Sequence, residues 1–407
     1  MAKEYKDLVV GLDIGTAKVM AVVAEVMPGG DLRLAGLGMA PSHGLKRGVV
    51  VNIDATVQSI QQALKEAELM ADCKISRVWT GITGSHIRGQ NSTGMVIVRD
   101  KEVAPIDVQR VVETAKAINI PNDQRLLLVE PQEFIIDGHE VKEPIGMSGG
   151  RLEVKVHIVT GAQSAAENII KCVRRCGLEA EQLVLNPSAS SSAVLTEDEK
   201  SLGVAMVDIG AGTTDVSIFT DGSVRHTAVI PIAGDLITSD IAMALRTPTK
   251  DAEDIKVDKQ LLADPNEHVE VPGLGDRAPR MLSRQALAGV IEPRVEEIFS
   301  LVHQVIRDSG YEELLSSGIV LTGGSAVMPG MVELAEDIFL KPVRKGTPLY
   351  AGPLHDMVAS PRSATVMGLL EEARLARSRG MKAAQQVGSV QTLCGRVREG
   401  AVGRFYK

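Results

Sequence analysis

A chain of 407 residues is longer than one hydrophobic core usually supports, so we expect two domains or one large two-lobed unit. Its net charge of -8 excludes a general affinity for nucleic acid, which requires concentrated Lys and Arg. Four scattered cysteines exclude a disulfide framework, and no apolar run reaches the length of about 18 residues that a membrane-spanning helix needs.

The first element of the chain is a strand that starts at Leu8 and ends in the turn Asp13-Ile14-Gly15-Thr16. The charged residues before it lack the apolar core of a signal peptide, so we expect a protein of the reducing cytosol. An alternating apolar strand, Val19 to Val26, and a third strand, Asp31 to Met39, follow the turn. The pattern predicts a β-hairpin with Gly and Asp at its turn.

Residues 86–162 read as a separate small α/β subdomain. Apolar segments at Met95 to Val98, Leu126 to Val129 and Leu152 to Thr160 predict strands, and a helix is expected from Asp107 to Ile118. We therefore expect this subdomain to be inserted into the first lobe.

The first hairpin is repeated in the second half of the chain. Val204 to Asp208 leads through a Gly-rich turn into Asp215 to Phe219, and Gly222 to Ile232 supplies the third strand. Both copies contain Asp-Ile-Gly in the same strand-turn-strand setting, which indicates a duplicated domain.

The two turns have the composition of phosphate-binding loops. Gly lets backbone N–H groups approach phosphate oxygens without a Cβ in the way. Asp13 and Asp208 would repel a bare phosphate unless Mg²⁺ and its waters lay between them. The pair therefore predicts a metal-nucleotide; the alternative is two ordinary hairpins with Gly turns.

A third Gly-containing element, Gly318 to Ser325, is an apolar strand that ends in a Gly pair before a helix begun by Pro329. Such a turn can hold a nucleotide base or an α-phosphate against its backbone, although strand-Gly-Gly-helix turns are common in proteins of other functions.

Two phosphate hairpins and a Gly-Gly turn resemble the signature of the superfamily of actin, sugar kinases and heat-shock chaperones. Further segments resemble the bacterial cell-division FtsA family: Ala67–Cys73, Pro131–Phe134, Val194–Glu199, Arg225–Thr227, Val290–Arg294 and Gly318–Gly324. The resemblance implies an α/β, two-lobed actin-like ATPase fold made of duplicated ribonuclease-H-like domains, with an FtsA-type inserted subdomain.

The resemblance also implies a division of the chain. We expect the following parts: a first-lobe core at 1–85, 163–195 and 360–375, an inserted subdomain at 86–162, a second-lobe core at 196–234 and 302–359, a second-lobe subdomain at 235–301, a linker at 376–389, and an amphipathic membrane-targeting segment at 390–407.

By the same resemblance, we expect a nucleotide site with ATP and Mg²⁺ as cofactors. Asp13 and Asp208 would hold the metal through water. Glu253 and Lys256 would contact ribose and adenine; the alternative for that pair is a solvated surface ion pair. The expected binding residues are Gly11, Asp13, Gly15, Thr16, Ala17, Lys18, Asp208, Gly210, Gly212, Thr213, Thr214, Gly234, Asp235, Glu253, Lys256, Gly323, Gly324 and Ser325.

One catalytic candidate follows from the same resemblance. Actin-like ATPases usually place Glu or Gln where this chain has Asn186, which is too short and cannot act as a base. We expect ATP binding with at most slow ATPase activity. The alternative is a sugar kinase or exopolyphosphatase on the same fold, but a kinase needs a further carboxylate at the cleft, and the sequence does not mark one.

The resemblance implies a self-assembling protein at the cytoplasmic face of the bacterial inner membrane, at the division septum. It would tether the FtsZ ring there and recruit later division proteins through 86–162. The FtsZ C-terminal peptide would bind the second-lobe subdomain, for which the candidate residues are Arg277, Arg280, Arg284, Glu292 and Arg294. The alternative is a charged solvent face.

The last segment of the chain combines apolar residues with arginines, as an amphipathic helix on anionic lipid would. Three glycines there each disfavour a helix by about 1 kcal/mol, so the alternative is a disordered tail. We expect weak membrane anchoring that depends on self-assembly. The expected membrane residues are Val390, Leu393, Val397, Val402 and Phe405.

Overall fold

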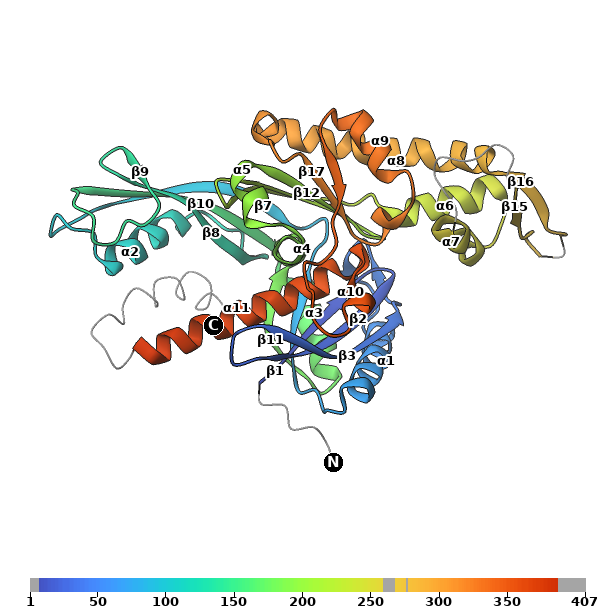
Figure 1. Cartoon of the computed structure of the whole chain (residues 1–407), viewed down its shortest axis with the longest axis horizontal. Coiled ribbons are helices and arrows are strands. Elements are labelled where there is room, and N and C mark those ends of the chain that lie inside the picture. Colours follow the sequence, from blue (N-terminus) through green and yellow to red (C-terminus); the bar gives the residue numbers. More distant parts are fainter. Residues whose placement is uncertain (1–6, 259–267, 276, 387–407) are drawn as a thin grey trace.

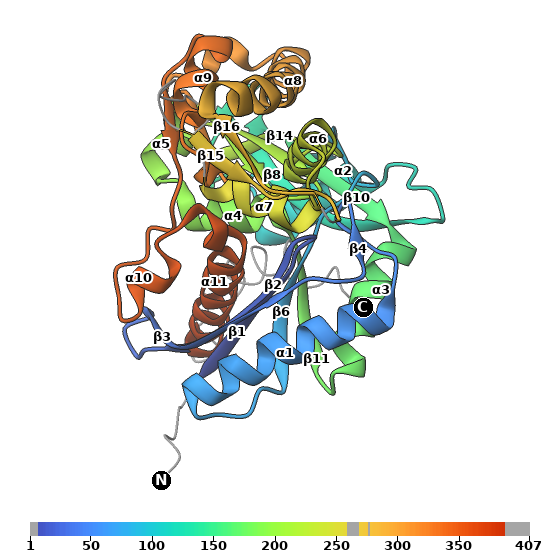
Figure 2. The same ribbon diagram turned by 90° about the vertical axis from the view of Figure 1, so that its right-hand side faces the viewer.

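The computed structural model describes residues 7–258, 268–275 and 277–386. Two lobes, each built on its own five-stranded sheet, lie one above the other (Figures 1 and 2). A smaller sheet extends to the left of the second lobe in Figure 1, and a small hairpin lies at the opposite end.

The first lobe is a sheet of order β11-β6-β1-β2-β3 covered by helices on both faces. Side chains alternate along each strand, so β1 packs Val10 and Leu12 against one pair of helices and Val9 against the other pair. The strands are β1 (Leu8–Ile14), β2 (Lys18–Val26), β3 (Leu32–Pro41), β6 (Arg77–Ile82) and β11 (Glu179–Leu185). On one face lie α1 (Ile53–Ala71) and α3 (Gln163–Arg175), and on the other α4 (Asn186–Val194) and α11 (Ala364–Gln386).

The second lobe repeats this arrangement in a sheet of order β14-β13-β12-β17-β18. In each lobe an antiparallel hairpin carries a third antiparallel strand on one side and a parallel strand on the other. The duplicated architecture predicted from the two hairpins is confirmed. The strands are β12 (Val204–Ile209), β13 (Thr214–Thr220), β14 (Ser223–Ile230), β17 (Ile319–Thr322) and β18 (Val343–Lys345). The main core of this lobe packs the sheet against α6 (Gly234–Leu245), α8 (Arg284–Ser309) and α9 (Met331–Phe339).

The inserted segment forms a four-stranded sheet of order β7-β10-β8-β9 with its own apolar core. Its strands are longer than the sequence predicts, and its helix begins and ends two residues earlier than expected. The elements are β7 (Arg88–Ile97), α2 (Pro105–Lys116), β8 (Gln124–Ile136), β9 (His139–Val141) and β10 (Arg151–Ala162).

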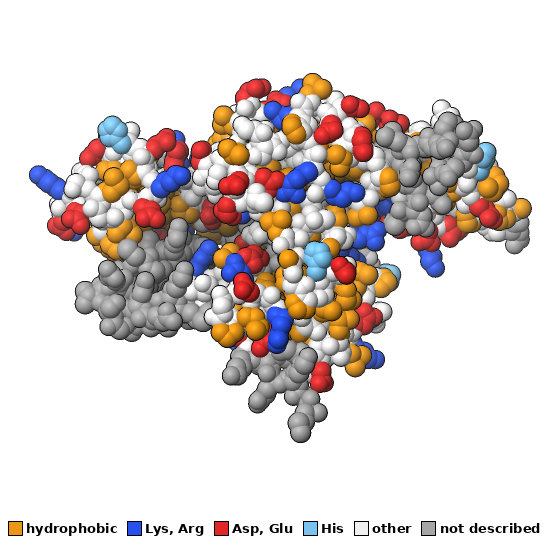
Figure 3. Space-filling view, in the orientation of Figure 1, with side chains coloured by type: hydrophobic (Ala, Val, Ile, Leu, Met, Phe, Trp, Pro, Cys, Tyr) orange, Lys and Arg blue, Asp and Glu red, His pale blue; other side chains and the backbone are white. Residues whose placement is uncertain are grey.

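The remaining strands and α-helices of the described chain are β4 (Leu45–Lys46), β5 (Val49–Val50), α5 (Glu197–Leu202), α7 (Thr249–Asp258), β15 (His268–Val271), β16 (Arg280–Ser283) and α10 (His355–Val358). Three short 3-10 helices lie at Glu312–Leu314, Ser325–Val327 and Pro361–Ser363. Among the described residues, every helix is too short or too polar to cross a bilayer. On the face shown in Figure 3, Lys and Arg are interspersed with Asp and Glu over both lobes.

Candidate functional site

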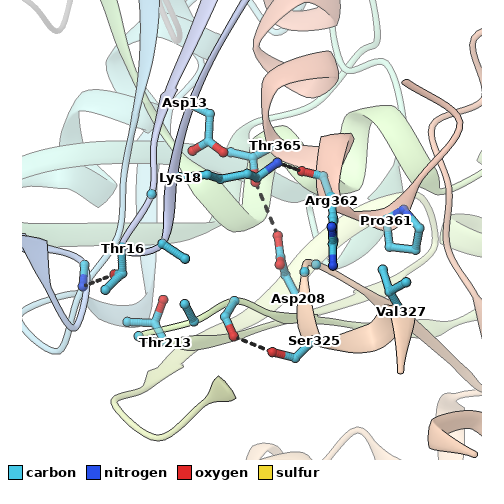
Figure 4. A pocket seen from close by; sticks show the side chains of 18 of the residues that line it. Asp13, Thr16, Lys18, Asp208, Thr213, Ser325, Val327, Pro361, Arg362 and Thr365 are labelled. Atoms are coloured by element: carbon cyan, nitrogen blue, oxygen red, sulfur yellow. Dashed lines mark hydrogen bonds between the residues drawn. The ribbon is translucent and has the colours of Figure 1, made fainter. Parts of the chain in front are cut away.

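A cavity of about 520 Å³ lies between the lobes and is lined by residues from both of them. Its volume is within the range of small-molecule sites. Figure 4 shows the two hairpin turns, one from each lobe, meeting at this cavity with Asp13, Lys18 and Asp208 at its centre.

The two turns have equivalent backbone hydrogen bonds. In the first lobe, the N–H of Gly15 donates to the carbonyl of Lys18 over 2.9 Å, and in the second lobe the N–H of Gly210 donates to that of Thr213 over 2.9 Å. The turns also approach each other closely, because a Cβ on Gly212 would lie 2.5 Å from Thr16 Oγ1. Only Gly fits at this position, so the sequence pattern and the geometry agree.

Asp13, the next-to-last residue of β1, has a buried carboxyl. Burial raises the pKa of Asp13 to about 6, against the lowering effect of Lys18 and with a further increase from Asp208. The Lys18 ammonium donates to the backbone carbonyl of Arg362. Its own pKa is lowered, first by burial, with the Asp13 charge acting in the opposite direction.

Asp208 occupies the equivalent place in the second lobe. The hydroxyl of Ser190 donates to its carboxylate over 2.6 Å, and that of Thr365 donates over 3.4 Å. Burial raises the pKa of Asp208 despite these hydrogen bonds. Both hairpin carboxyls therefore lie in a site that favours an added positive charge.

A third carboxyl in the cavity, Asp215, was not predicted. It lies directly opposite Asp208 in the β12–β13 hairpin, and its Oδ1 accepts from the Thr83 hydroxyl of the first lobe over 2.8 Å. Burial, and then the charge of Asp208, raises the pKa of Asp215 to about 8. The only sequence signal was one carboxylate near the start of a buried strand. Asp215 is therefore a further carboxylate at the cleft, which the sequence did not mark.

The Gly-Gly turn, Gly323 and Gly324, forms part of the cavity wall together with Ser325. Ser325 donates from its hydroxyl to the carbonyl of Gly210 over 2.8 Å, which ties the turn to the second hairpin. Lys256 contacts Glu253 over 2.6 Å and Thr238 Oγ1 over 2.9 Å, and it is only 5 % exposed. Glu253 and Lys256 both line the cavity, so this pair belongs to the cavity wall.

Comparison with known proteins places these features in a family. The family model described as "Cell division protein FtsA" matches residues 205–368, and "SHS2 domain inserted in FTSA" matches residues 84–160. The chain is 56% identical to the cell division protein FtsA of Pseudomonas aeruginosa over 379 residues, which cover 92% of this chain and 91% of that protein. The chain belongs to the FtsA family. The FtsA of Neisseria meningitidis serogroup B is 52% identical, covering 89% of each chain.

Solved structures agree with the actin-like fold of this FtsA-family chain. The PilM–PilN type IV pilus biogenesis complex matches with a TM-score of 0.65 and 18% identity, covering 90% of this chain and 98% of the other. MreB5 of Spiroplasma citri bound to ADP matches with a TM-score of 0.55 and 15% identity, covering 93% and 99%. The predicted fold class, including the FtsA-type insertion, is confirmed.

Most of the expected nucleotide residues of this FtsA-family chain line the cavity, and four do not. A Cβ on Gly11 would lie 2.8 Å from the carbonyl of Val366, so this Gly allows α11 to approach β1. The Thr214 hydroxyl donates to a backbone carbonyl. Gly234 and Asp235 lie behind the second turn, and their N–H groups donate to its carbonyls.

Asn186, the weak catalytic candidate, also lines the cavity of this FtsA-family chain. Its Oδ1 is buried and has no hydrogen-bond partner within the described part of the chain. A Cβ on Gly81 would lie 2.1 Å from that oxygen, so the Asn186 side chain packs directly on β6.

The candidate FtsZ-binding residues lie on β16, on α8 and, for Arg277, in the loop before β16; two of the five side chains make hydrogen bonds within the chain. Arg280 donates to the carbonyl of Leu245, and Arg294 donates to Asp240 over 2.6 Å. Arg277 is exposed, Glu292 is half-buried, and Arg284 begins α8, with a side chain outside the described structure. The expected membrane residues Val390, Leu393, Val397, Val402 and Phe405 also lie outside the described residues.

Proposed function

We propose that this chain binds Mg²⁺·ATP between its lobes. The observation that carries the proposal is the pair of equivalent Gly turns, one from each lobe, that face one cavity with a buried Asp at the end of each preceding strand. The actin-like neighbour MreB5 was solved with ADP and with AMPPNP, which supports a nucleotide at this place in the fold.

Each group in the cavity has a role that follows from its chemistry. The backbone N–H groups of the two turns donate to phosphate oxygens, and the Lys18 ammonium offsets phosphate charge. Asp13 and Asp208 would hold Mg²⁺ through its waters, and the raised pKa values of both carboxyls fit a site that a cation would stabilise. Bound Mg²⁺ would supply the positive charge that lets carboxylates and phosphates share the cavity.

We further propose at most slow ATP hydrolysis. The amide of Asn186 cannot accept a proton from water, although it lies in the cavity wall where actin-like ATPases carry Glu or Gln. ATP then acts mainly as a structural switch that holds the lobes together.

Calorimetry of Mg²⁺·ATP binding to the full chain tests this proposal. Replacing Lys18 with Ala removes a charge-assisted contact and is expected to weaken binding at least tenfold. Lys65, exposed on α1, provides the matched control, because K65A removes the same charge outside the cavity. No heat of binding with the unmodified protein, or equal affinities for K18A and K65A, would contradict the proposed site.

At the cellular level, we propose that the protein self-assembles on the inner face of the cytoplasmic membrane at the septum and tethers the FtsZ ring there. Membership of a family of cell division proteins supports this role. The second-lobe subdomain would hold the FtsZ C-terminal peptide, the inserted subdomain would contact later division proteins, and the segment after residue 389 would bind anionic lipid.

Liposome sedimentation tests the membrane part of the proposal. Full-length protein and a truncation after Ser389 are compared on vesicles containing anionic lipid, with and without ATP. The full chain is expected to sediment with the vesicles, and more so with ATP, because assembled tails add avidity. Equal sedimentation of both forms would refute the tether.

A further inference from the structure

The inserted subdomain belongs to the first lobe in sequence, but its sheet also contacts the second lobe. Its polar side chains bond to the edge strand β14, which borders that lobe's sheet. Asn91 donates to the carbonyl of Arg225 over 3.2 Å, and Gln132 donates to that of Val224 over 2.9 Å. In return, the Ser223 hydroxyl donates to the carbonyl of Gln132 over 3.2 Å. The insertion therefore bridges the lobes.

A buried histidine completes this contact. His157 of β10 is 1 % exposed, with Nδ1 2.6 Å from Asn91 Oδ1 and Nε2 2.9 Å from Thr227 Oγ1. Burial lowers the pKa of His157 to about 4, so the imidazole is neutral at physiological pH. An amide oxygen only accepts, so Nδ1 carries the proton and Nε2 accepts from the Thr227 hydroxyl. The hydrogen bonds of His157 with Asn91 and Thr227 therefore fix a single tautomer of the imidazole.

The same face of the second-lobe sheet continues to the cavity. Thr227 is paired with Ser217 across β13 and β14, and Asp215 lies two residues before Ser217, so all three side chains share a face. With His157 they form a polar seam in which every member is at most 4 % exposed. The Ser217 hydroxyl in the middle has no partner among the described residues.

At the cavity end of the seam, Asp215 accepts a hydrogen bond from Thr83, which lies at the root of the insertion, just before its first residues. Thr83, which donates to Asp215, directly precedes Gly84, whose φ of +139° few other residues adopt. His86, two residues after Gly84, packs on β10, the strand that leaves the insertion. A Cβ on Gly161 of that strand would lie 3.2 Å from Nδ1 of His86. One end of the seam thus contacts Thr83, in the loop that leads from β6 into the insertion, and the other end is His157 of the inserted sheet.

We propose that the polar seam Asp215–Ser217–Thr227–His157 couples occupancy of the cavity to the orientation of the inserted subdomain relative to the second lobe. A ligand shifts a conformational equilibrium only through unequal interactions with its two states. Charge bound beside Asp215 acts on its hydrogen bond with Thr83, which joins the second lobe to the loop before the insertion. The coupling rests on the proposed binding of nucleotide.

The orientation of the insertion determines what its exposed apolar residues face. Met95 and Ile97 of β7 are 54 % and 70 % exposed, and this strand is an edge of the inserted sheet. Coupling through the seam would make the presentation of this edge depend on the nucleotide.

Pulsed electron spin resonance tests the coupling. Spin labels are placed at exposed Glu113 of α2 and Glu296 of α8, in full-length protein that lacks the four native cysteines. Distances are measured without nucleotide, with ADP and with AMPPNP and Mg²⁺. The main distance is expected to shift on adding AMPPNP. In T227V, which removes the hydroxyl at nearly constant shape, the distribution is expected to broaden and to lose that shift.

T227S retains the hydroxyl and provides the matched control, which is expected to behave like the parent protein. Calorimetry on the same samples is expected to give AMPPNP affinities within threefold for all three proteins. Binding without a distance change in the parent, or an unchanged shift in T227V, would overturn the coupling alone. Absence of binding in the parent would overturn the proposed function and the coupling together.

Discussion

The carboxyl of Asp215 makes the stability of the nucleotide-free protein depend on pH in a defined direction. Its pKa is about 8 in the folded protein, against a value of 3.8 for an unperturbed Asp. The folded state therefore binds a proton more tightly than the unfolded state does. Between about pH 4 and 8, Asp215 is ionised in the unfolded chain and takes up a proton on folding. The free energy of unfolding therefore falls as pH rises through this range, and the contribution of Asp215 to it is constant above about pH 8.

Replacing Asp215 with Asn isolates that contribution. The Asn oxygen can still accept from Thr83, while the titrating proton is removed. We expect the free energy of unfolding of D215N to exceed that of the parent by an amount that grows with pH. The upper limit is about 1.4 kcal/mol per pH unit, or about 6 kcal/mol by pH 8. Relaxation of the site and the charges of neighbouring carboxyls make the real difference smaller than this limit. An increase of about 1 kcal/mol in the stability advantage of D215N between pH 6 and pH 8 suffices as a test.

Urea unfolding followed by circular dichroism at pH 6, 7 and 8 measures this difference. D100N removes an exposed carboxyl of the inserted subdomain and serves as the matched control. A D215N advantage of the same size at pH 6 and pH 8 would refute the reasoning, since it would show that Asp215 binds no extra proton in the folded state.

Two further predictions concern packing and the cavity wall. A Cβ on Gly368 would lie 1.7 Å from the carbonyl of Ala189, so G368A is expected to separate α11 from α4 and destabilise the first lobe by about 2–3 kcal/mol. Urea unfolding followed by the fluorescence of Trp79, the sole tryptophan, should then show a lower midpoint, and an unchanged midpoint would contradict the prediction. K256M leaves Glu253 without its cation and is expected to weaken ATP binding about tenfold by calorimetry, whereas unaltered affinity would place the nucleotide elsewhere.

The two hairpins and their Gly turns were predictable because their signal is local. Gly in a turn and an Asp at the end of an apolar strand are visible within a dozen residues, and the repeat of Asp-Ile-Gly strengthened the inference. The matching hydrogen bonds at Gly15 and Gly210 show the same solution in both lobes. Alternation along the strands likewise indicated which side chains enter the core.

The roles of Gly11 and Asp215 could not be predicted, because they depend on residues far away in the chain. Gly11 reads as part of the first phosphate loop, yet it is required by the approach of α11, more than 350 residues later in the sequence. Asp215 reads as a strand residue, and only the register with Asp208 and the donor Thr83 reveals its place in the cavity. Local patterns do not encode such contacts.

The contact between the insertion and β14 has an energetic consequence for motion between the lobes. Four hydrogen bonds of 3.2 Å or less join the insertion to this edge strand. Three involve the insertion side chains Asn91, Gln132 and His157, and in the fourth the Ser223 hydroxyl of β14 donates to the carbonyl of Gln132. At about 1 kcal/mol each, these four hydrogen bonds oppose separation of the insertion from β14 by about 4 kcal/mol. Rotation of the second lobe must therefore carry the insertion with it or break this contact. An insertion held at its root alone would permit a hinge at Gly84, whereas the hydrogen bonds to β14 hold this insertion at a second point, on the other lobe.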